Sequence, residues 1–455
     1  MDFDWRHPLR IGPLMLRLPW PRAMFGLGGL MTDAPSPRGP RAGRKAAFGF
    51  IFASSVMNAI SFGIMIPVLP NLLKQMTGGD FAQASDWNVV FASTWGVMQF
   101  FSGPFLGLLS DRVGRRPILL VSLGGLAIDF LFMALAPTLG WLYLGRIING
   151  LTAATFSTAG AYVADITPPE GRAKAFGMMG AAFGFGFLIG PVLGGLVAHY
   201  YSLRTPFFVA AALTGANWLY GLLVLPESLP PERRVTAFTL KKANPIGSLI
   251  FLRRHAQLLL LAGINFLFLF AQNVLPTVFV LYAGYRYHWS ILIMSLTLTG
   301  TGALSIFTQM VAVGPVVARI GERGALLVGL VSGILGFALY AYAPVGWVYV
   351  ASAPVFALIN FVPAGVQGLM SRRVGPSEQG QLQGANQSLQ GIASILGPVV
   401  FGTTFSLAVR HDARWHTPGL PIYIASATLM VALLLAQRVL PAPAAIIAPE
   451  DAGTI

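Results

Sequence analysis

The chain lacks cysteine and carries little charge. None of its 455 residues is cysteine, which excludes disulfides and thiolate metal sites and leaves the redox compartment undetermined. Charged residues make up 10% of the chain and hydrophobic residues 55%, whereas a soluble domain carries about 25% charged residues. This shortage of polar surface excludes a water-soluble globular fold, so a lipid bilayer must be the solvent.

The segments of the chain that have few charged residues form long apolar runs. A run of about 20 apolar residues crosses hydrocarbon as a helix, and continuous runs favour helices over the alternating ten-residue segments of a membrane barrel. The twelve runs are roughly 47–73, 88–110, 116–136, 141–165, 175–198, 205–226, 256–284, 290–317, 324–343, 346–369, 383–409 and 420–440. We therefore expect an all-α membrane protein with twelve transmembrane helices.

The net charge of +14 is consistent with nucleic acid binding, but the basic residues gather on one side of the threaded chain. With the N-terminus inside, the internal loops carry Arg112, Arg115, Arg116, Arg172, Lys174, Arg233, Arg234, Lys241, Lys242, Arg253, Arg254, Arg319, Arg323, Arg372 and Arg373. The external loops carry only Lys74, Arg204, Arg286, Arg410 and Arg414. This asymmetry predicts two cytoplasmic termini and a lipid bilayer, not nucleic acid, as the partner.

The sequence repeats itself at a constant offset of 207 residues. The offset superposes Asn58 on Asn265, Arg112 on Arg319, Gly114 on Gly321, Ala136-Pro137 on Ala343-Pro344, Gly177 on Gly384 and Gly190-Pro191 on Gly397-Pro398. Six helices separate the copies, so both enter the membrane from the same side and form parallel repeats. We expect a disordered cytoplasmic tail, a six-helix bundle, a cytoplasmic linker, a second six-helix bundle and a cytoplasmic tail, at 1–45, 46–226, 227–255, 256–440 and 441–455.

The first 45 residues are rich in Arg, Pro and Gly and lack the apolar region and cleavage site of a signal peptide. Two explanations remain open. The segment is a basic tail that touches anionic lipid, or the reading frame is over-extended and translation starts at Met31.

A hydrophilic joint between two apolar runs carries the most informative motif. It reads Gly107-Leu-Leu-Ser-Asp111-Arg112-Val-Gly114-Arg115-Arg116-Pro117 and resembles the signature loop of the major facilitator superfamily. In that family such a loop fastens the two bundles in the outward-open state, so the resemblance implies a conformational latch formed by Gly107, Asp111, Arg112, Gly114, Arg115 and Arg116. The alternative is a generic basic loop on the cytoplasmic side.

Two more motifs extend the resemblance to proton-driven drug antiporters. Leu144-Gly145-Arg146-Ile-Ile-Asn149-Gly150 resembles the fourth-helix motif of proton-driven members, and an antiporter motif of the fifth helix is matched by Gly186, Gly190, Pro191, Gly194 and Gly195. The overlap with tetracycline/proton antiporters runs from about residue 48 to 440. Small residues four positions apart also occur as ordinary helix packing, so the antiporter assignment depends on the resemblance.

Asp129 and Arg146 are the ionisable residues that the predicted helices place well inside hydrocarbon. Each costs about 2.5–3.5 kcal/mol there unless it is paired or hydrated, so we expect both to face a cavity. Apolar surroundings favour a protonated Asp129, whereas a nearby Arg146 favours the ionised form. This opposition predicts a proton-coupling site, with a permanent structural ion pair as the alternative.

Polar side chains at membrane depth are candidates to line a substrate cavity. They are Asn58, Gln99, Asn149, Asn265, Gln272, Asn273, Gln309, Asn360 and Gln390. Any one of them is also consistent with a hydrogen bond between helices. The histidines lie in the tail, in loops or at helix ends, where they are poor midplane proton carriers; they are His7, His199, His255, His288, His411 and His416.

The chain departs from the tetracycline exporters at three acidic or basic positions. Those exporters carry an Asp, a His and an Asp near the positions of Asn58, Ser305 and Gly333, all neutral here. Asp129 is then the main coupling acid, and the case for a metal-chelated tetracycline as cargo is weakened.

Three functions are compatible with these sequence features. Proton-coupled efflux of a small amphipathic or drug-like compound, of the kind that confers antibiotic resistance, is favoured; import or facilitated diffusion of a metabolite on the same fold is the alternative. The third function, a membrane enzyme, is disfavoured because the sequence shows no metal-ligand cluster and no nucleophile triad. We expect a monomer in the bacterial inner membrane, with a small molecule and protons as partners and with no cofactor or metal.

Overall fold

A computed structural model describes residues 41–235, 247–253, 256–375 and 378–440. One compact unit spans residues 44–455. The predicted tails, apart from residues 41–45, and the centre of the predicted linker lie outside the described residues. The same holds for His7, Met31, Lys241, Lys242, Arg254 and His255.

Seven helices form the first half of the described chain. They are α1 (Arg41–Met76), α2 (Phe81–Val113), α3 (Arg115–Leu135), α4 (Leu139–Thr152), α5 (Thr155–Ile166), α6 (Pro169–Tyr200) and α7 (Thr205–Val224). The short helices η2 (Pro231–Arg233) and α8 (Gly247–Leu252) follow in the predicted linker.

The second half repeats this plan with more interruptions. Its helices are α9 (Ala256–Gln272), α10 (Val274–Tyr287), α11 (Ile291–Phe307), the π-helical turn η4 (Thr308–Ala312), α12 (Val313–Tyr342), α13 (Gly346–Ala351), α14 (Ala353–Ala357), η5 (Leu358–Asn360), α15 (Phe361–Ser371), α16 (Gln379–Arg410), α17 (Asp412–Trp415) and α18 (Leu420–Ala436). No strand occurs in these described ranges, so the predicted all-α class is confirmed.

The helices accommodate all twelve predicted apolar runs. Nine described helices are long and apolar enough to cross a membrane, by length and composition. One of them, Ile291–Tyr342, contains two predicted runs joined through Gly321. The run at 141–165 is divided between α4 and α5, and α18, with 17 residues, is too short to be counted as a span. These differences explain why nine spans correspond to twelve runs.

Equivalent helix ends confirm the 207-residue repeat. Gly114, between α2 and α3, has φ +115°, and its counterpart Gly321 has φ +73°, a region that side chains other than glycine rarely adopt. Ala136 and Ala343 each precede a proline, which disfavours helical backbone, and they end α3 and α12 with hydrogen bonds to the carbonyls of Phe132 and Leu339. The same sequence signals therefore end the same helices in both halves.

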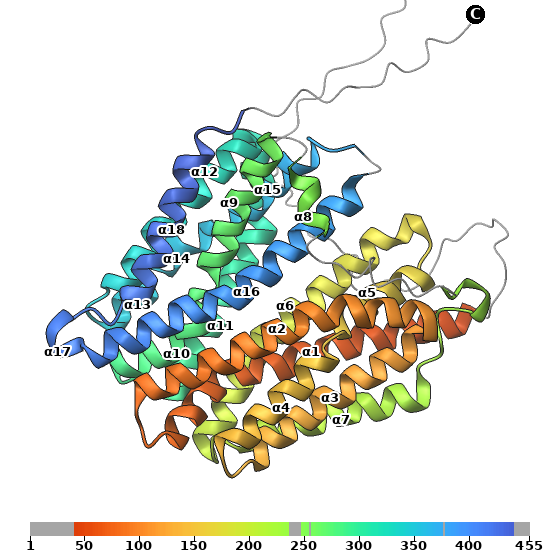
Figure 1. The fold of residues 1–455 in the computed structure, drawn as a ribbon, viewed down its shortest axis with the longest axis horizontal. Helices are drawn as coiled ribbons and strands as arrows, with labels where there is room; N and C mark the ends of the chain where they lie inside the picture. Colours follow the sequence, from red (N-terminus) through yellow and green to blue (C-terminus); the bar gives the residue numbers. More distant parts are fainter. Residues whose placement is uncertain (1–40, 236–246, 254–255, 376–377, 441–455) are drawn as a thin grey trace, which may run out of the picture. The chain divides into compact units, whose positions relative to one another are not determined.

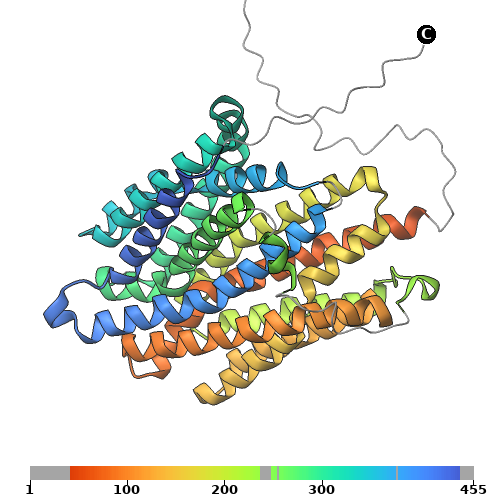
Figure 2. The ribbon, with the colours of Figure 1, turned by 45° about the horizontal axis from the view of Figure 1, so that its top comes forward.

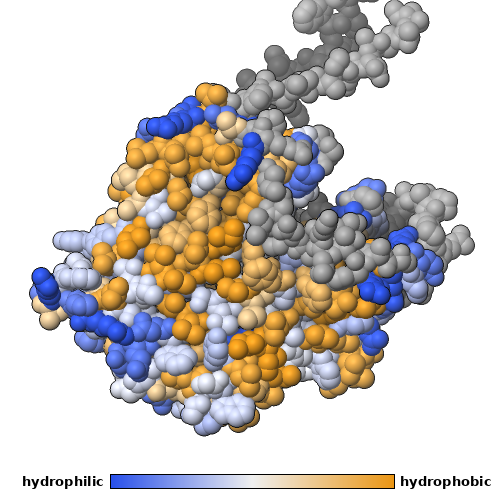
Figure 3. Space-filling model, viewed as in Figure 1, coloured by the Kyte–Doolittle hydropathy of each residue, from blue (hydrophilic) through white to orange (hydrophobic). Residues whose placement is uncertain are grey.

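The visible surface suits a bilayer. Figure 3 shows apolar residues over the middle of this face and hydrophilic residues mainly towards its ends. Exposed large side chains include Leu223 on α7 and Leu335 on α12, at 73% and 52% exposure. Lipid tails cover such residues without cost, because the bilayer interior is itself apolar.

Two helix pairs make the most extensive contacts between the halves, α2 with α16 and α6 with α11. Figures 1 and 2 both show α2 and α16 side by side. We call the end of the bundle at Gly114 the hinge end and the opposite end, where α17 follows α16, the Arg410 end (right and left in Figure 1).

Candidate functional site

The structure brings Asp129 of α3 and Arg146 of α4 together in the interior of the first half. Nη2 of Arg146 lies 2.6 Å from Oδ2 of Asp129, and Nδ2 of Asn149, one turn further along α4, donates to the same oxygen at 2.6 Å. Asp129 is 0% exposed and Arg146 is 4% exposed. The two charges are thus paired out of contact with solvent.

The pair is incompletely satisfied. Oδ1 of Asp129 and Nε of Arg146 are buried without a hydrogen-bond partner among the described residues. Nη2 of Arg146 also contacts the sulfur atoms of Met65 at 3.0 Å and Met133 at 3.5 Å, which are weak acceptors. Oδ1 is therefore a buried carboxylate position at which a proton could be held.

Gly145 explains how α4 approaches this carboxylate. A Cβ atom at this position would lie 3.0 Å from Oδ1 of Asp129 and 2.8 Å from Cβ of Phe132. Because any side chain would separate the two helices, the glycine before Arg146 sets the distance at which the ion pair forms.

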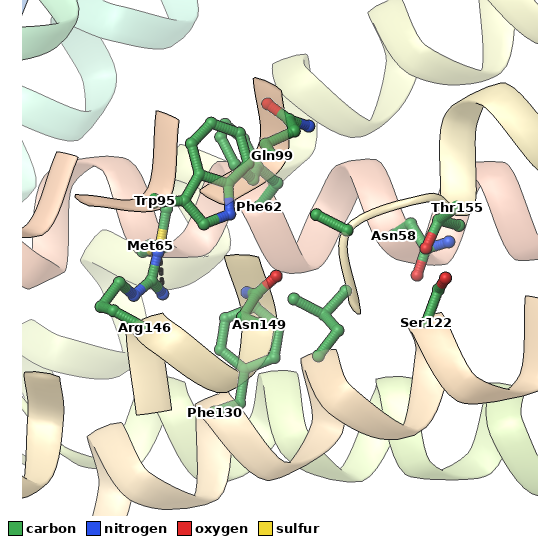
Figure 4. Close-up of a pocket in the computed structure, with 12 residues that line it drawn as sticks. Asn58, Phe62, Met65, Trp95, Gln99, Ser122, Phe130, Arg146, Asn149 and Thr155 are labelled. Carbon is green, nitrogen blue, oxygen red and sulfur yellow. Dashed lines mark hydrogen bonds between the residues drawn. The ribbon is translucent and has the colours of Figure 1, made fainter. Parts of the chain in front are cut away.

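A cavity lies beside the pair in the first half (Figure 4). Its walls are Asn58, Phe62, Met65, Trp95, Gln99, Ser122, Leu126, Phe130, Arg146, Asn149, Ala153 and Thr155. The break between α4 and α5 at residues 153–154 borders it. Asp129 is not part of the wall, so an occupant of the cavity would meet Arg146 and Asn149 while Asp129 stays behind them.

Three of the nine predicted polar candidates, Asn58, Gln99 and Asn149, share this cavity. The others lie in the second half, outside its walls. Asn265 donates to Asn386 of α16 at 3.2 Å, and Gln309 donates to Asn360 at 3.4 Å; both bonds join helices. Asn273 donates to a backbone carbonyl of its own turn at 2.8 Å, whereas Gln272 is half-buried and Gln390 is exposed.

The hinge residues contact their own half. Asp111 pairs with Arg115 at 2.6 Å, and Arg115 also reaches Asp165 at the end of α5 at 3.2 Å. Nη2 of Arg116 donates to the carbonyl of Leu222 on α7 at 2.7 Å. Within the described ranges, every partner found for these charged groups belongs to the first half. Arg112 is exposed, and a Cβ added at Gly107 would meet nothing within 4 Å.

Glu227, which the sequence did not single out, caps α3. Its carboxylate accepts the backbone N–H groups of Arg115 at 2.8 Å and Arg116 at 3.2 Å. A carboxylate at a helix N-terminus satisfies free N–H groups and favours the helix dipole. Glu227, from the chain after α7, thus holds the N-terminus of α3 in place.

The glycines of the fifth-helix motif join α6 to α1. A Cβ atom at Gly190 would lie 2.6 Å from Cα of Gly63, and one at Gly194 would lie 2.8 Å from the carbonyl oxygen of Ile64. Gly186 is equally close to the backbone of α1, at Ala59 and Ile60, and Pro191 is buried. Gly195 instead faces Ser295 of α11, so one helix supports both the first half and its contact with the second.

Polar contacts join the halves at the Arg410 end. Asp86 pairs with Arg410 at 2.5 Å, and Ser85 donates to the carbonyl of Gly402 at 2.9 Å. Closer to mid-helix, Phe100 of α2 lies beside Gly391 of α16, and Gly184 of α6 lies beside Ile306 of α11. Contacts of α2 and α6 with the second half thus include both the Arg410 end and mid-helix.

Comparison with known proteins identifies the family of the chain. Residues 51–398 match the family model described as "Major Facilitator Superfamily". The chain is 37% identical over 391 residues to the class C tetracycline resistance protein of Escherichia coli, covering 85% of this chain and 96% of the relative, and 34% identical to the class E protein of the same species, over 84% and 92%. The crystal structure of the human organic anion transporter MFSD10 is 23% identical, with a TM-score of 0.63, and covers 88% of this chain and 100% of that one.

Proposed function

This chain belongs to the major facilitator superfamily, in the branch of the tetracycline resistance proteins, and from that premise we propose that it exports a small amphipathic compound in exchange for protons. The observation that carries the proposal is the buried carboxylate of Asp129, paired with Arg146 and Asn149 behind a cavity wall. A buried acid with one free oxygen can hold a proton, and a neighbouring arginine that also faces the cavity can sense cargo.

The coupling follows from competition for one carboxylate. Protonation of Asp129 removes the charge that holds Arg146 and Asn149, so their polar groups become available to the cavity. Deprotonation draws both back to Oδ2, because a charged acceptor strengthens the hydrogen bonds that it receives. Side chains freed by protonation compete with cargo for space in the cavity, so cargo binds best when Asp129 is deprotonated and leaves when a proton binds, as exchange requires.

Alternating access supplies the second requirement of antiport. We infer that residues 46–226 and 256–440 rock as two bundles, as transporters with parallel repeats do. The contacts at the Arg410 end and the one-sided pairing of Asp111 support a state that is closed at the Arg410 end, with the latch released. In the opposite state, Asp111 and its arginines would fasten the halves at the hinge end.

The basic residues indicate orientation. We propose that the hinge end faces the cytoplasm, because Arg112, Arg115 and Arg116 follow the preference of basic loops for that side. Both termini would then be cytoplasmic, in the inner membrane of a bacterium. The proposal needs no enzyme activity and no second copy of the chain.

The cargo need not be a metal chelate. The described residues hold no group of three or more His, Cys, Asp or Glu side chains that could bind a metal ion, and the cavity wall is polar through amides and one guanidinium. We propose an uncharged or weakly polar, drug-like compound that accepts hydrogen bonds.

The test is transport in proteoliposomes that contain the purified chain. A pH gradient is imposed, a panel of amphipathic compounds that includes tetracycline is supplied, and compound and internal pH are followed together. Proton-coupled export predicts that at least one compound moves against its gradient while protons move the other way. Movement down its own gradient without proton flux would favour the facilitative alternative and overturn antiport.

A further inference from the structure

The second half contains a cavity that the sequence did not reveal. It lies among α10, α11, α12, α13 and α14. Rings and hydroxyl groups form much of its wall, namely those of Phe279, Thr301, Ser305, Tyr340, Tyr349 and Phe356. Its described lining contains no Asp, Glu, Lys, Arg or His.

Missing side chains on α11 create this space. The 207-residue offset pairs Trp95 of α2 with Gly302 of α11, and Met98 with Ser305. Both replacements remove bulk from the side of α11 that lines the cavity. A Cβ atom added at Gly302 would meet nothing within 4 Å, so this glycine borders open space and is not required by close packing.

The ionic network of the first half has no counterpart here. The same offset pairs Asp129 with Gly336, Arg146 with Ala353 and Asn149 with Phe356. Phe356 occupies the space beside Gly336, where an added Cβ atom would lie 2.8 Å from its Cα. An aromatic ring therefore lies at the depth where the first half holds its charges.

Tyr340 contributes a buried hydroxyl group to the cavity residues. Its ring stacks on Tyr349, with centroids 4.1 Å apart and planes 13° apart, and it is 1% exposed. Its hydroxyl group has no hydrogen-bond partner among the described residues. A buried hydroxyl without a partner is costly, and a bound molecule with a polar atom could satisfy it.

We propose that this cavity is a binding site for the uncharged aromatic part of a cargo molecule, with the Tyr340 hydroxyl as its hydrogen-bond partner. The inference rests on the proposed export function and adds the chemical class of the cargo. Aromatic walls offer stacking and edge contacts, and the lack of acids or bases selects against a formal charge that would have to be desolvated.

The position on α11 links occupancy to the movement of the halves. Thr299, on the same helix as the cavity residues Thr301 and Gly302, donates to the carbonyl of Leu188 on α6 at 3.1 Å. A molecule packed against α11 therefore contacts a helix that takes part in one of the two most extensive contacts between the halves.

The absence of cysteine allows a site-specific test. Ser305→Cys places a single thiol in the cavity wall, and Leu296→Cys places one on the same helix at a position that is 51% exposed and outside the wall. The full-length variants in nanodiscs are labelled with N-ethylmaleimide, with and without N-phenyl-1-naphthylamine, an uncharged amine with two aromatic groups. We expect the probe to slow labelling of Ser305→Cys by about tenfold at ten times its dissociation constant and to leave Leu296→Cys unchanged.

A cavity-filling variant supplies the second arm. Gly302→Trp restores the side chain of the first half and should lower the affinity for tritiated N-phenyl-1-naphthylamine by at least about tenfold, whereas Leu296→Trp adds the same indole outside the cavity and should bind normally. Tyr340→Phe keeps the ring and should lower affinity by a smaller factor. Tetraphenylphosphonium, a cation with similar rings, should not compete.

Several results would overturn the site: equal protection of both cysteines, normal binding by Gly302→Trp, or full competition by tetraphenylphosphonium. If Gly302→Trp does not fold, cysteine protection decides alone. Asp129→Asn separates the two proposals, because it should bind the probe normally while losing proton-driven transport. Retained proton-driven transport in Asp129→Asn would contradict the proposed coupling and leave the aromatic site intact.

Discussion

At the depth where the first half buries Asp129 against Arg146, the second half packs the partly buried Phe356 against Gly336. The helix ends at Gly114 and Gly321 and at Ala136 and Ala343 are alike, so the difference is one of side chains on a shared backbone plan. One half holds a paired charge and the other holds rings. A repeat fold can thus place a buried ion pair in one copy and an aromatic cavity in the other.

The division has a physical basis. An ion pair in a bilayer protein needs tightly fitted polar partners, which Gly145 and Asn149 provide. An apolar cargo instead needs space and rings, which Gly302 and Tyr349 provide. The two requirements conflict within one pocket and can be met in separate halves of one chain.

The largest expected effect comes from removing the charge of the first half. Asp129→Asn preserves side-chain size but cannot exchange a proton, so proton-driven transport in proteoliposomes should fall to the level of protein-free vesicles. Glu322→Gln removes a carboxylate of the second half, which pairs with Arg372 at 2.5 Å, and should retain transport. Equal transport rates in Asp129→Asn and Glu322→Gln would contradict the assignment of proton coupling to the first half.

A change of packing should have the next largest effect. Gly190→Ala forces a methyl group against the backbone of Gly63, and overpacking of this kind costs about 1–3 kcal/mol. At its counterpart Gly397, an added Cβ atom would lie 2.4 Å from Cβ of Asn273, which moves only with its backbone, so Gly397→Ala should be destabilised by a similar amount.

Thermal unfolding in detergent would measure both variants. Gly184→Ala is the control, because its methyl group would approach Ile306 at an ordinary 3.6 Å. A melting temperature for Gly190→Ala equal to that of this control would contradict the close α1–α6 contact.

Loss of the latch should shift the equilibrium between states more modestly. Asp111 has Ala318 as its counterpart, so the acid is particular to the first half. Asp111→Ala should favour the state closed at the Arg410 end, by about tenfold if one hydrogen bond to a charged group is lost. Maleimide labelling of Ser85→Cys, buried at that end, should slow accordingly.

The exposed acid Glu232 provides the matched control for the latch. Glu232→Gln removes a carboxylate from the linker and should leave labelling of Ser85→Cys unchanged. Faster labelling in Asp111→Ala would reverse the assigned role.

The smallest effect is expected where the halves meet. Arg410 and Asp86 have side chains 53% and 41% exposed, and exposed pairs contribute about 0.2–1 kcal/mol. Arg410→Gln should therefore raise labelling of Ser85→Cys by less than about fivefold, and less at high salt. An unchanged rate at low salt would remove this pair from the contacts that close the Arg410 end.

Several features of the site could be predicted because the free-energy cost that causes them arises at one residue, whatever its neighbours in the fold. A charged residue in hydrocarbon needs a partner wherever it lies, so Asp129 and Arg146 were expected to face inward, and the structure pairs them. Glu227 could not be found this way, since it lies 112 residues from the N–H group that it caps. Asp86 and Arg410 are 324 residues apart, and both are exposed residues with ordinary surroundings in the sequence.

The second cavity illustrates a different limit. The replacement of Trp95 by Gly302 is visible in the repeat, but a glycine on a membrane helix can equally indicate close packing. Only the residues that surround Gly302 in the fold distinguish empty space from close packing, because packing depends on which face of α11 meets α10 and α12.

The sequence by itself determined the solvent, the number of crossings, the repeat and the need to pair the buried charges. Each of these follows from the price of polar groups in hydrocarbon, which acts on every short segment independently. The tertiary structure decided which oxygen of Asp129 stays free, which helices join the two halves and where empty space remains. These depend on distances between helices far apart in the chain, which no local pattern encodes.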